Sequence, residues 1–119
     1  MSPKLDWKKL GFEYLPTRCH VHSTYMDGEW SKIEIHKKDN FSINIAATCL
    51  HYGQSCFEGL KAFRNKNGTI RIFRPDENLK RMNNTADYLH CPRIPEKLFY
   101  DALKTVIREN ADYVPPYGT

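Results

Sequence analysis

The sequence predicts an α+β fold in which an antiparallel sheet of hairpins packs against two helices. Two turn signals, Asp27-Gly28 and Asn65–Gly68, each separate segments that are rich in β-branched and aromatic residues, which is typical of hairpins. Further along the sequence, apolar residues recur every three or four positions, as in amphipathic helices. Strands in hairpins followed by helices favour the α+β class over alternating βαβ units.

The first segment has no hydrophobic period. Residues 1–18 mix Lys, Pro, Gly and aromatic residues, so we expect an irregular arm that Phe12, Tyr14 and Leu15 anchor by packing. Residues 19–119 then form one small and incomplete domain, whose length permits only a modest core.

Two hairpins are expected in the first part of this domain. The first spans Cys19–His36 and the second pairs Thr69–Phe73 with a largely buried strand over 57–63. Between the hairpins, Phe41–Leu50 is apolar and predicts a strand that runs into a short helical turn at Ala46–Cys49.

Two helices are expected after the hairpins. Pro75 is well placed at the first position of a helix, because a proline lacks the N–H that would have no partner there. This helix ends near His90, and its apolar stripe comprises Leu79, Met82, Ala86 and Leu89. The second helix begins near Pro95-Glu96 and faces the core with Leu98, Phe99, Ala102, Leu103, Val106 and Ile107.

Composition and charge exclude several classes of protein. The first ten residues carry no apolar run of the signal-peptide kind, and no stretch of eighteen apolar residues predicts a membrane span, so we expect a cytoplasmic protein. A net charge of +4 suits an anionic ligand or a nucleic acid, but the basic residues never form the clustered stripe that nucleic-acid binding requires. We therefore expect neither a nucleic-acid nor a membrane partner.

Cysteine and histidine residues predict neither a disulfide framework nor a metal site. The four cysteines show no C-x-x-C spacing, and in a cytosolic protein they are expected to be reduced. His20 and His22 alternate on one face of a predicted strand next to Cys19, which resembles part of a metal site. A zinc site needs three or four ligands in a closed set, and no partner cluster follows at recognisable spacing.

Arg81 lies at the border of the apolar stripe of the first helix. From that position its stem can be buried while its forked guanidinium reaches a site at the sheet edge, where it would suit a phosphate. The alternative interpretation is a surface arginine paired with Glu77, four positions earlier.

The segment 50–64 contains the other candidate groups. Glu58 and Lys61 either form an ion pair or face opposite sides of a strand, from where Lys61 could contribute to a carboxylate pocket or remain a solvated edge residue. Tyr52 and Phe57 would supply apolar walls if Gly53 and Gly59 leave space for a ligand, and otherwise would belong to the core.

Three parts of the sequence resemble a known family. They are the motif LHYGQ with CFEGLKAFR at 50–64, the motif FRPDENLKRM at 73–82 and the tail YVPPYGT at 113–119. Together these motifs closely resemble the branched-chain amino acid aminotransferases, which are fold-type IV enzymes that depend on pyridoxal 5'-phosphate. The resemblance covers most of the sequence from about Tyr25 onward.

The resemblance implies a role for several residues. It implies that Arg81 binds the cofactor phosphate, that Tyr52 and Phe57 line the side-chain pocket, and that Lys61 lies near this pocket. It also implies the α+β small N-terminal domain of the family and a homodimer in which Tyr52 reaches the partner's active site. The substrates implied are branched-chain amino acids and 2-oxo acids.

The resemblance also implies what the sequence lacks. In the family the lysine that forms the internal aldimine belongs to a larger C-terminal domain, and no lysine of this sequence matches its motif, so we expect the fragment alone to be inactive. Related alternatives are a D-amino acid aminotransferase and aminodeoxychorismate lyase, both also of fold type IV. A nucleic-acid-binding module without catalytic activity is an alternative of another class.

Overall fold

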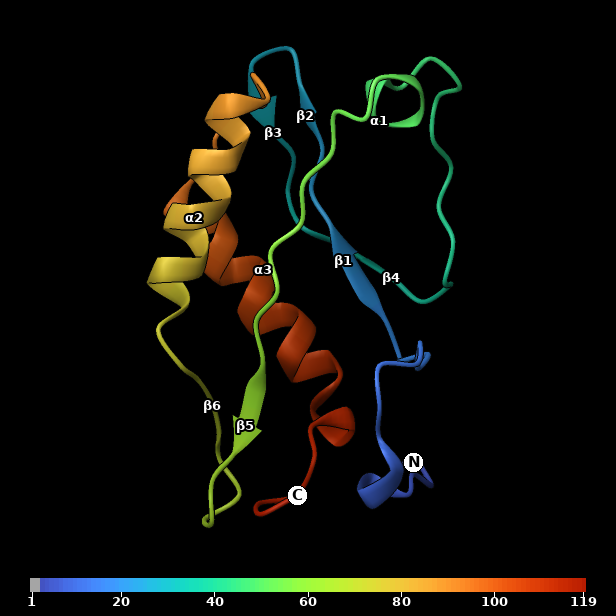
Figure 1. Cartoon of the computed structure of the whole chain (residues 1–119), viewed down its shortest axis with the longest axis vertical. Coiled ribbons are helices and arrows are strands. Elements are labelled where there is room, and N and C mark those ends of the chain that lie inside the picture. The colour runs from blue at the N-terminus through green and yellow to red at the C-terminus, as the bar shows by residue number, and fades with distance from the viewer. Residues whose placement is uncertain (1–2) are drawn as a thin grey trace.

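Residues 3–119 are described by the computed structural model of the chain (Figure 1). Both termini lie at the same end of an elongated molecule that measures 43 × 28 × 25 Å. The elements in sequence order are η1 (Trp7–Lys9), β1 (His20–His22), β2 (Tyr25–Met26), β3 (Glu29–Trp30), β4 (Glu34–His36), α1 (Thr48–His51), β5 (Ala62–Arg64), β6 (Ile70–Ile72), α2 (Pro75–Tyr88), α3 (Glu96–Glu109) and η2 (Ala111–Tyr113).

The first hairpin is confirmed and consists of two short antiparallel ladders, β2–β3 next to the turn and β1–β4 further from it. Asp27 and Gly28 both have positive φ, which a two-residue type I′ turn requires. Two residues separate β1 from β2, whereas three separate β3 from β4, so the second strand contains one extra residue. This β-bulge explains why one predicted hairpin is divided into two ladders.

The second hairpin, β5–β6, is also confirmed, with Phe63 paired to Arg71 across the ladder. Its turn is closed by a hydrogen bond from the Asn65 N–H to the Thr69 carbonyl, and Gly68 supplies the positive φ that the turn needs. The predicted antiparallel α+β architecture is therefore the one observed.

Helix α2 begins and ends as its sequence predicts. Pro75 occupies the first helical position after Arg74, which adopts a left-handed conformation. At the other end His90 has φ 54°, and the Cys91 N–H donates to the Ala86 carbonyl at 2.8 Å. This is a Schellman motif, in which a left-handed residue stops the helix while the last carbonyls remain hydrogen-bonded.

A buried asparagine joins α3 to β1. Asn110 follows the last residue of α3, and its Oδ1 accepts a hydrogen bond from the Cys19 N–H at 3.1 Å. Its Nδ2 donates to the carbonyls of Cys19 and Val106, both at 2.9 Å. Asn110 therefore pairs with Cys19 as a neighbouring strand would, and it fixes the end of α3 against the start of the hairpin.

A second buried asparagine, Asn83, joins α2 to the segment that precedes α3. Asn83 of α2 accepts from the Ile94 N–H at 2.8 Å and donates to the Ile94 carbonyl at 3.1 Å. Each amide accepts from one main-chain N–H and donates to main-chain carbonyls, two for Asn110 and one for Asn83, so the buried polar groups are satisfied.

The molecule exposes more surface than a compact protein of its size. Its accessible area is 9740 Å², whereas a folded monomer of 14.0 kDa has about 6,700 Å². The radius of gyration is 16.0 Å, compared with about 13.5 Å for a compact domain of 119 residues. Among the described residues, only three apolar ones are buried, namely Cys19, Leu79 and Ala86.

Several sequence predictions about burial are therefore wrong. Phe12, Tyr14 and Leu15 are exposed, so they do not anchor the N-terminal arm. The apolar residues of α3 are only half-buried, because β1 is the main element packed against this helix and leaves part of its apolar face uncovered. The two helices and the two hairpins form where predicted, but within residues 3–119 no further element covers these surfaces.

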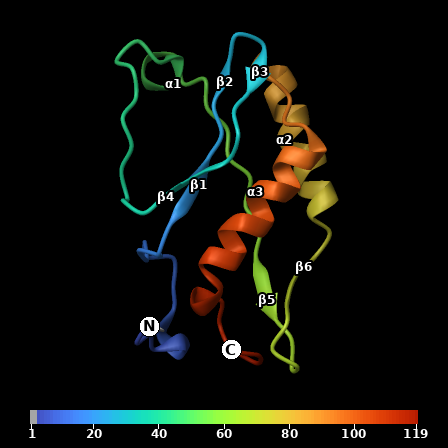
Figure 2. The ribbon, with the colours of Figure 1, turned by 180° about the vertical axis from the view of Figure 1, so that it is seen from behind.

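Two predicted strands also fail to form in full. In Figures 1 and 2, the segment from β4 to α1 stands away from the rest of the molecule. Among residues 3–119 no strand pairs with residues 41–47, and the short helix forms two residues later than predicted, at α1. The strand predicted over 57–63 is reduced to β5, because its partner β6 ends at Ile72 and α2 begins at Pro75, which leaves residues 57–61 without a strand to pair with among residues 3–119.

Candidate functional site

Arg81 on α2 forms a bidentate ion pair with Glu58. Its Nε donates to Glu58 Oε2 at 2.8 Å, and its Nη2 donates to Glu58 Oε1. The sequence offered Glu77 as a partner of Arg81 and Lys61 as a partner of Glu58, and both pairings are wrong. Glu77 instead pairs with Arg74 at 3.1 Å.

Asn78 holds the same carboxylate from one turn earlier on α2. Its Nδ2 donates to Glu58 Oε1 at 2.9 Å and to the Gly59 carbonyl at 3.0 Å. Residues three positions apart share one face of a helix, so Asn78 and Arg81 together bind the segment that carries Glu58. This segment has no regular secondary structure of its own, and α2 therefore determines its position.

The two members of the ion pair differ in exposure. The side chain of Glu58 is 8% exposed, whereas that of Arg81 is 69% exposed. The hydrogen bonds from Arg81 lower the pKa of Glu58 to about 2, against the opposing effect of burial and with further help from Asn78. Glu58 is thus a nearly buried carboxylate in a fixed position, and the guanidinium that it binds is exposed to solvent.

A small cavity adjoins Arg81. Its volume is about 220 Å³, and it is lined by Phe73, Arg74, Glu77, Asn78 and Arg81. Glu58 occupies only the Nε–Nη2 edge of the guanidinium, and Nη1 donates no hydrogen bond to any group within residues 3–119. The Nη1–Nη2 edge is therefore available for a second bidentate interaction with an anion.

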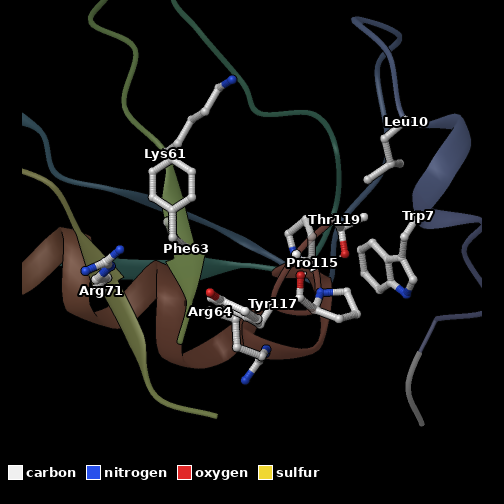
Figure 3. Close-up of a pocket in the computed structure, with 12 residues that line it drawn as sticks. Trp7, Leu10, Lys61, Phe63, Arg64, Arg71, Pro115, Tyr117 and Thr119 are labelled. Atoms are coloured by element: carbon white, nitrogen blue, oxygen red, sulfur yellow. Dashed lines mark hydrogen bonds between the residues drawn. The ribbon is translucent and has the colours of Figure 1, made fainter. Parts of the chain in front are cut away.

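Lys61 lines a different and larger cavity of about 530 Å³ (Figure 3). Figure 3 shows Lys61 just before β5, Phe63 on β5 and Arg71 on β6, with Trp7 and Pro115 on the opposite side. Arg64 donates to the carbonyls of Gly68 and Ala111, so it links the second hairpin to η2. The lysine is exposed, and the cavity around it combines basic and aromatic side chains.

Tyr52 and Phe57 line neither cavity. Tyr52 is 84% exposed and Phe57 is 92% exposed, so both rings project from the surface of the molecule. The expectation that Phe57 lies in a largely buried strand is wrong. Phe57 is close to the Arg81 site only because it directly precedes Glu58 in the sequence.

Three histidines gather on one face of the β1–β4 ladder. The ring centroids of His22 and His36 are 4.3 Å apart, and those of His20 and His22 are 4.5 Å apart. Burial lowers the pKa of His22, and His36 and His20 lower it further, whereas Glu34 raises it. Within residues 3–119, no three His, Cys, Asp or Glu side chains are placed to hold a metal ion.

The four cysteines are all free thiols, as their spacing predicts. Among the helices of residues 3–119, none is long and apolar enough to cross a membrane.

Sequence reasoning missed the pairing of Glu58 with Arg81 and the roles of Asn83 and Asn78. Glu58 and Arg81 are 23 positions apart, and a local pattern cannot reveal such a pairing. Asn83 could have been found, because it lies four positions after Leu79 on the apolar stripe, where asparagine has poor helix propensity. Asn78 carries no such signal.

Comparison with curated proteins identifies relatives over nearly the whole sequence. A branched-chain-amino-acid aminotransferase of Haemophilus influenzae is 45% identical over 97% of this chain, and one of Helicobacter pylori is 42% identical over 95%. A chloroplastic branched-chain-amino-acid aminotransferase of Arabidopsis thaliana is 40% identical over 97%. No protein-family profile matches the sequence.

The match extends over only part of each relative. The matched region spans 34% of the Haemophilus protein, 33% of the Helicobacter protein and 28% of the Arabidopsis protein. The resemblance that the motifs predicted is confirmed by these relatives. This chain is thus homologous to the N-terminal third of branched-chain-amino-acid aminotransferases.

Proposed function

We propose that this protein provides the small domain of an aminotransferase that uses pyridoxal 5'-phosphate. The reaction would transfer the amino group between leucine, isoleucine or valine and 2-oxoglutarate. The observation that carries the proposal is the free guanidinium edge of Arg81 beside a small cavity, in a protein whose relatives are named branched-chain-amino-acid aminotransferases. Arg81 is also the residue that the motif at 73–82 assigns to the cofactor phosphate.

The residues present fit a phosphate. An arginine fork binds phosphate oxygens through two parallel N–H donors, and Arg81 retains such an edge after pairing with Glu58. Arg74 contributes a second guanidinium to the same cavity. The ion pairs Arg74–Glu77 and Arg81–Glu58 are each neutral overall. A phosphate would therefore be bound mainly by the directed N–H donors of the arginines, and the net charge of the cavity would contribute little.

Each remaining candidate has a role in binding. Arg81 would orient the cofactor by its phosphate, and Tyr52 and Phe57 would form apolar walls that favour an aliphatic side chain. Lys61, beside Phe63 and Arg71 at the larger cavity, would contribute a cation near the substrate. When bound, pyridoxal phosphate supplies the electron sink that amino-group transfer needs.

We further propose that the protein works as a homodimer. Tyr52 and Phe57 project from the surface, and the exposed area of the molecule exceeds that of a compact monomer by about 3,000 Å². Rings that are exposed in a single subunit can act as pocket walls only if another surface covers them. A partner subunit together with a larger domain would provide this surface.

The isolated segment of 119 residues should have no activity. Lysines that bond to a cofactor aldehyde must be desolvated and held within bonding distance. Lys61 is exposed, and no lysine of the sequence matches the motif of the family's catalytic lysine.

Formation of glutamate from leucine and 2-oxoglutarate, with added pyridoxal phosphate, tests the proposal. We expect turnover by the longest natural form of the protein and none above the free-cofactor rate by residues 1–119 alone. Leucine should be a much better substrate than alanine, and Phe57→Ala should reduce this preference, since each methylene contributes about 1–3 kcal/mol. Absence of turnover by the long form, or turnover by residues 1–119, would contradict the proposal.

A further inference from the structure

Glu58 is held more firmly than an ordinary surface carboxylate, and the proposed function gives it no role. Its side chain is nearly buried and receives hydrogen bonds from both Arg81 and Asn78. A surface ion pair formed only for stability would not need this arrangement, because exposed pairs contribute little. The way in which Glu58 fixes the Arg81 guanidinium therefore indicates a function for this ion pair other than stability.

The geometry of the ion pair separates the guanidinium into two edges. Glu58 engages Nε and Nη2, while the Nη1–Nη2 edge remains open on the side of an exposed residue. Arginine loses considerable rotational freedom when its head is fixed, so an unpaired Arg81 at this exposure would sample many positions. A carboxylate that fixes one edge before a ligand arrives removes most of this cost in advance.

The other contacts fix Glu58 itself. Asn78 donates to the carboxylate and to the next carbonyl, that of Gly59, so one residue holds both the side chain of Glu58 and the backbone that follows it. Both Asn78 and Arg81 belong to α2 and both line the small cavity. The position of the free edge is therefore determined by α2 and by Glu58 together.

We propose that Glu58 is a positioning residue that holds Arg81 so that its Nη1–Nη2 edge faces an incoming phosphate. This inference rests on the proposed function for the identity of the ligand, pyridoxal phosphate. Glu58 does not touch the phosphate, and it acts only through Arg81. The alternative is that Glu58 competes with the phosphate for the guanidinium, which makes the opposite prediction.

The test measures the affinity of the longest natural form of the protein for pyridoxal phosphate and for pyridoxal, which has no phosphate. Glu58→Gln keeps the size of the side chain and removes its charge. We expect it to weaken the binding of pyridoxal phosphate about five- to thirtyfold, the range that loss of side-chain ordering allows, and to leave pyridoxal binding unchanged. A purely structural role would change both affinities.

A double-mutant cycle shows whether Glu58 acts through Arg81. In an Arg81→Ala background, Glu58→Gln should cause no further loss of affinity for pyridoxal phosphate. Glu58→Asp, whose shorter side chain withdraws from Arg81 while its charge is kept, should weaken binding in the same direction as Glu58→Gln. This second variant provides the measurement if Glu58→Gln does not fold.

The possible outcomes distinguish the positioning role from the phosphate site. If Arg81→Ala weakens binding and Glu58→Gln does not, the positioning role is wrong and the phosphate site stands. Tighter binding by Glu58→Gln would show that Glu58 competes with the ligand, which also overturns the positioning role. If Arg81→Ala has no effect, the phosphate site and the role of Glu58 are both wrong.

Discussion

Two regions of the molecule use their side chains in opposite ways. Around Asn110 and Asn83, buried amides bind main-chain groups of distant segments and hold the helices in place. In the segment 50–61, which carries the most distinctive motif, Tyr52 and Phe57 are exposed. The motif therefore contributes little to the packing of this molecule, and its aromatic side chains remain available to another surface.

The segment nevertheless has a defined position. Gln54 donates to the Leu89 carbonyl at 2.6 Å, and Glu58 is held by Asn78 and Arg81. Its polar side chains bind α2 and the end of that helix, while its rings project outward. This division is what a binding surface requires, because its groups must be fixed before a ligand or partner arrives.

The largest effect is expected at Asn110. Asn110→Ala would leave the buried N–H of Cys19 without a partner, which costs about 1–3 kcal/mol. It would also remove one of the two hydrogen bonds to the Cys19 carbonyl, which Thr17 continues to bind, at a cost of about 0.5–1.5 kcal/mol. We expect the free energy of unfolding to fall by about 1.5–4.5 kcal/mol in chemical denaturation. Asn84→Ala is the matched control, because Asn84 is exposed, and it should change stability by less than about 0.5 kcal/mol. Equal effects of both substitutions would contradict the role assigned to Asn110.

The comparison between the core and the motif can be sharpened with two apolar truncations. Leu79→Ala removes a buried side chain of α2 and should cost about 2–4 kcal/mol. Phe57→Ala removes a larger side chain that is exposed, and it should change the free energy of unfolding by less than about 0.5 kcal/mol. A loss at Phe57 similar to that at Leu79 would place this ring in a core.

A smaller effect is expected from pH at the β1–β4 ladder. Burial, His36 and His20 lower the pKa of folded His22, so the unfolded state binds a proton more readily, near pH 6.5. The stability that neutral His22 contributes is therefore present above about pH 6.5 and is lost as the pH falls toward the lower folded pKa. Hydrogen exchange of the amides of β1 and β4, corrected for intrinsic rates, should show less protection at about pH 5.5 than at about pH 7.5.

His22→Gln supplies the control for this pH dependence. The variant should show a smaller loss of protection over the same range, because one of the titrating groups is gone. Equal loss in the variant and in the original protein would show that other groups cause the effect. His20, His36 and Glu34 are the nearest such groups.

The extent to which the sequence predicted the structure depends on the range of the interactions. Turns and helix ends depend on neighbours in sequence, so Asp27-Gly28 and Pro75 predicted the first hairpin and the start of α2 correctly. Strands depend on a neighbour in space, and residues 57–61 are not a strand because β6 ends at Ile72 and α2 begins at Pro75.

For the same reason, the sequence indicated Arg81 as a site residue but did not indicate its partner. Motif resemblance assigned Arg81 to a phosphate, whereas its spacing alone also suited a pair with Glu77. The actual partner, Glu58, comes from a separate segment, and only folding brings the two together. Exposure of Tyr52 and Phe57 could not be predicted, because aromatic residues in an apolar segment usually pack in a core.

The central claim is that Arg81 presents a guanidinium edge to the phosphate of pyridoxal phosphate. The direct measurement is the dissociation constant of pyridoxal phosphate for the longest natural form of the protein and for its Arg81→Ala and Arg81→Lys variants. Charged hydrogen bonds contribute about 1.5–3 kcal/mol each, so Arg81→Ala should weaken binding roughly tenfold to several hundredfold. Arg81→Lys should restore only part of this affinity, since a lysine cannot form the bidentate pair. An unchanged dissociation constant for Arg81→Ala would contradict the claim.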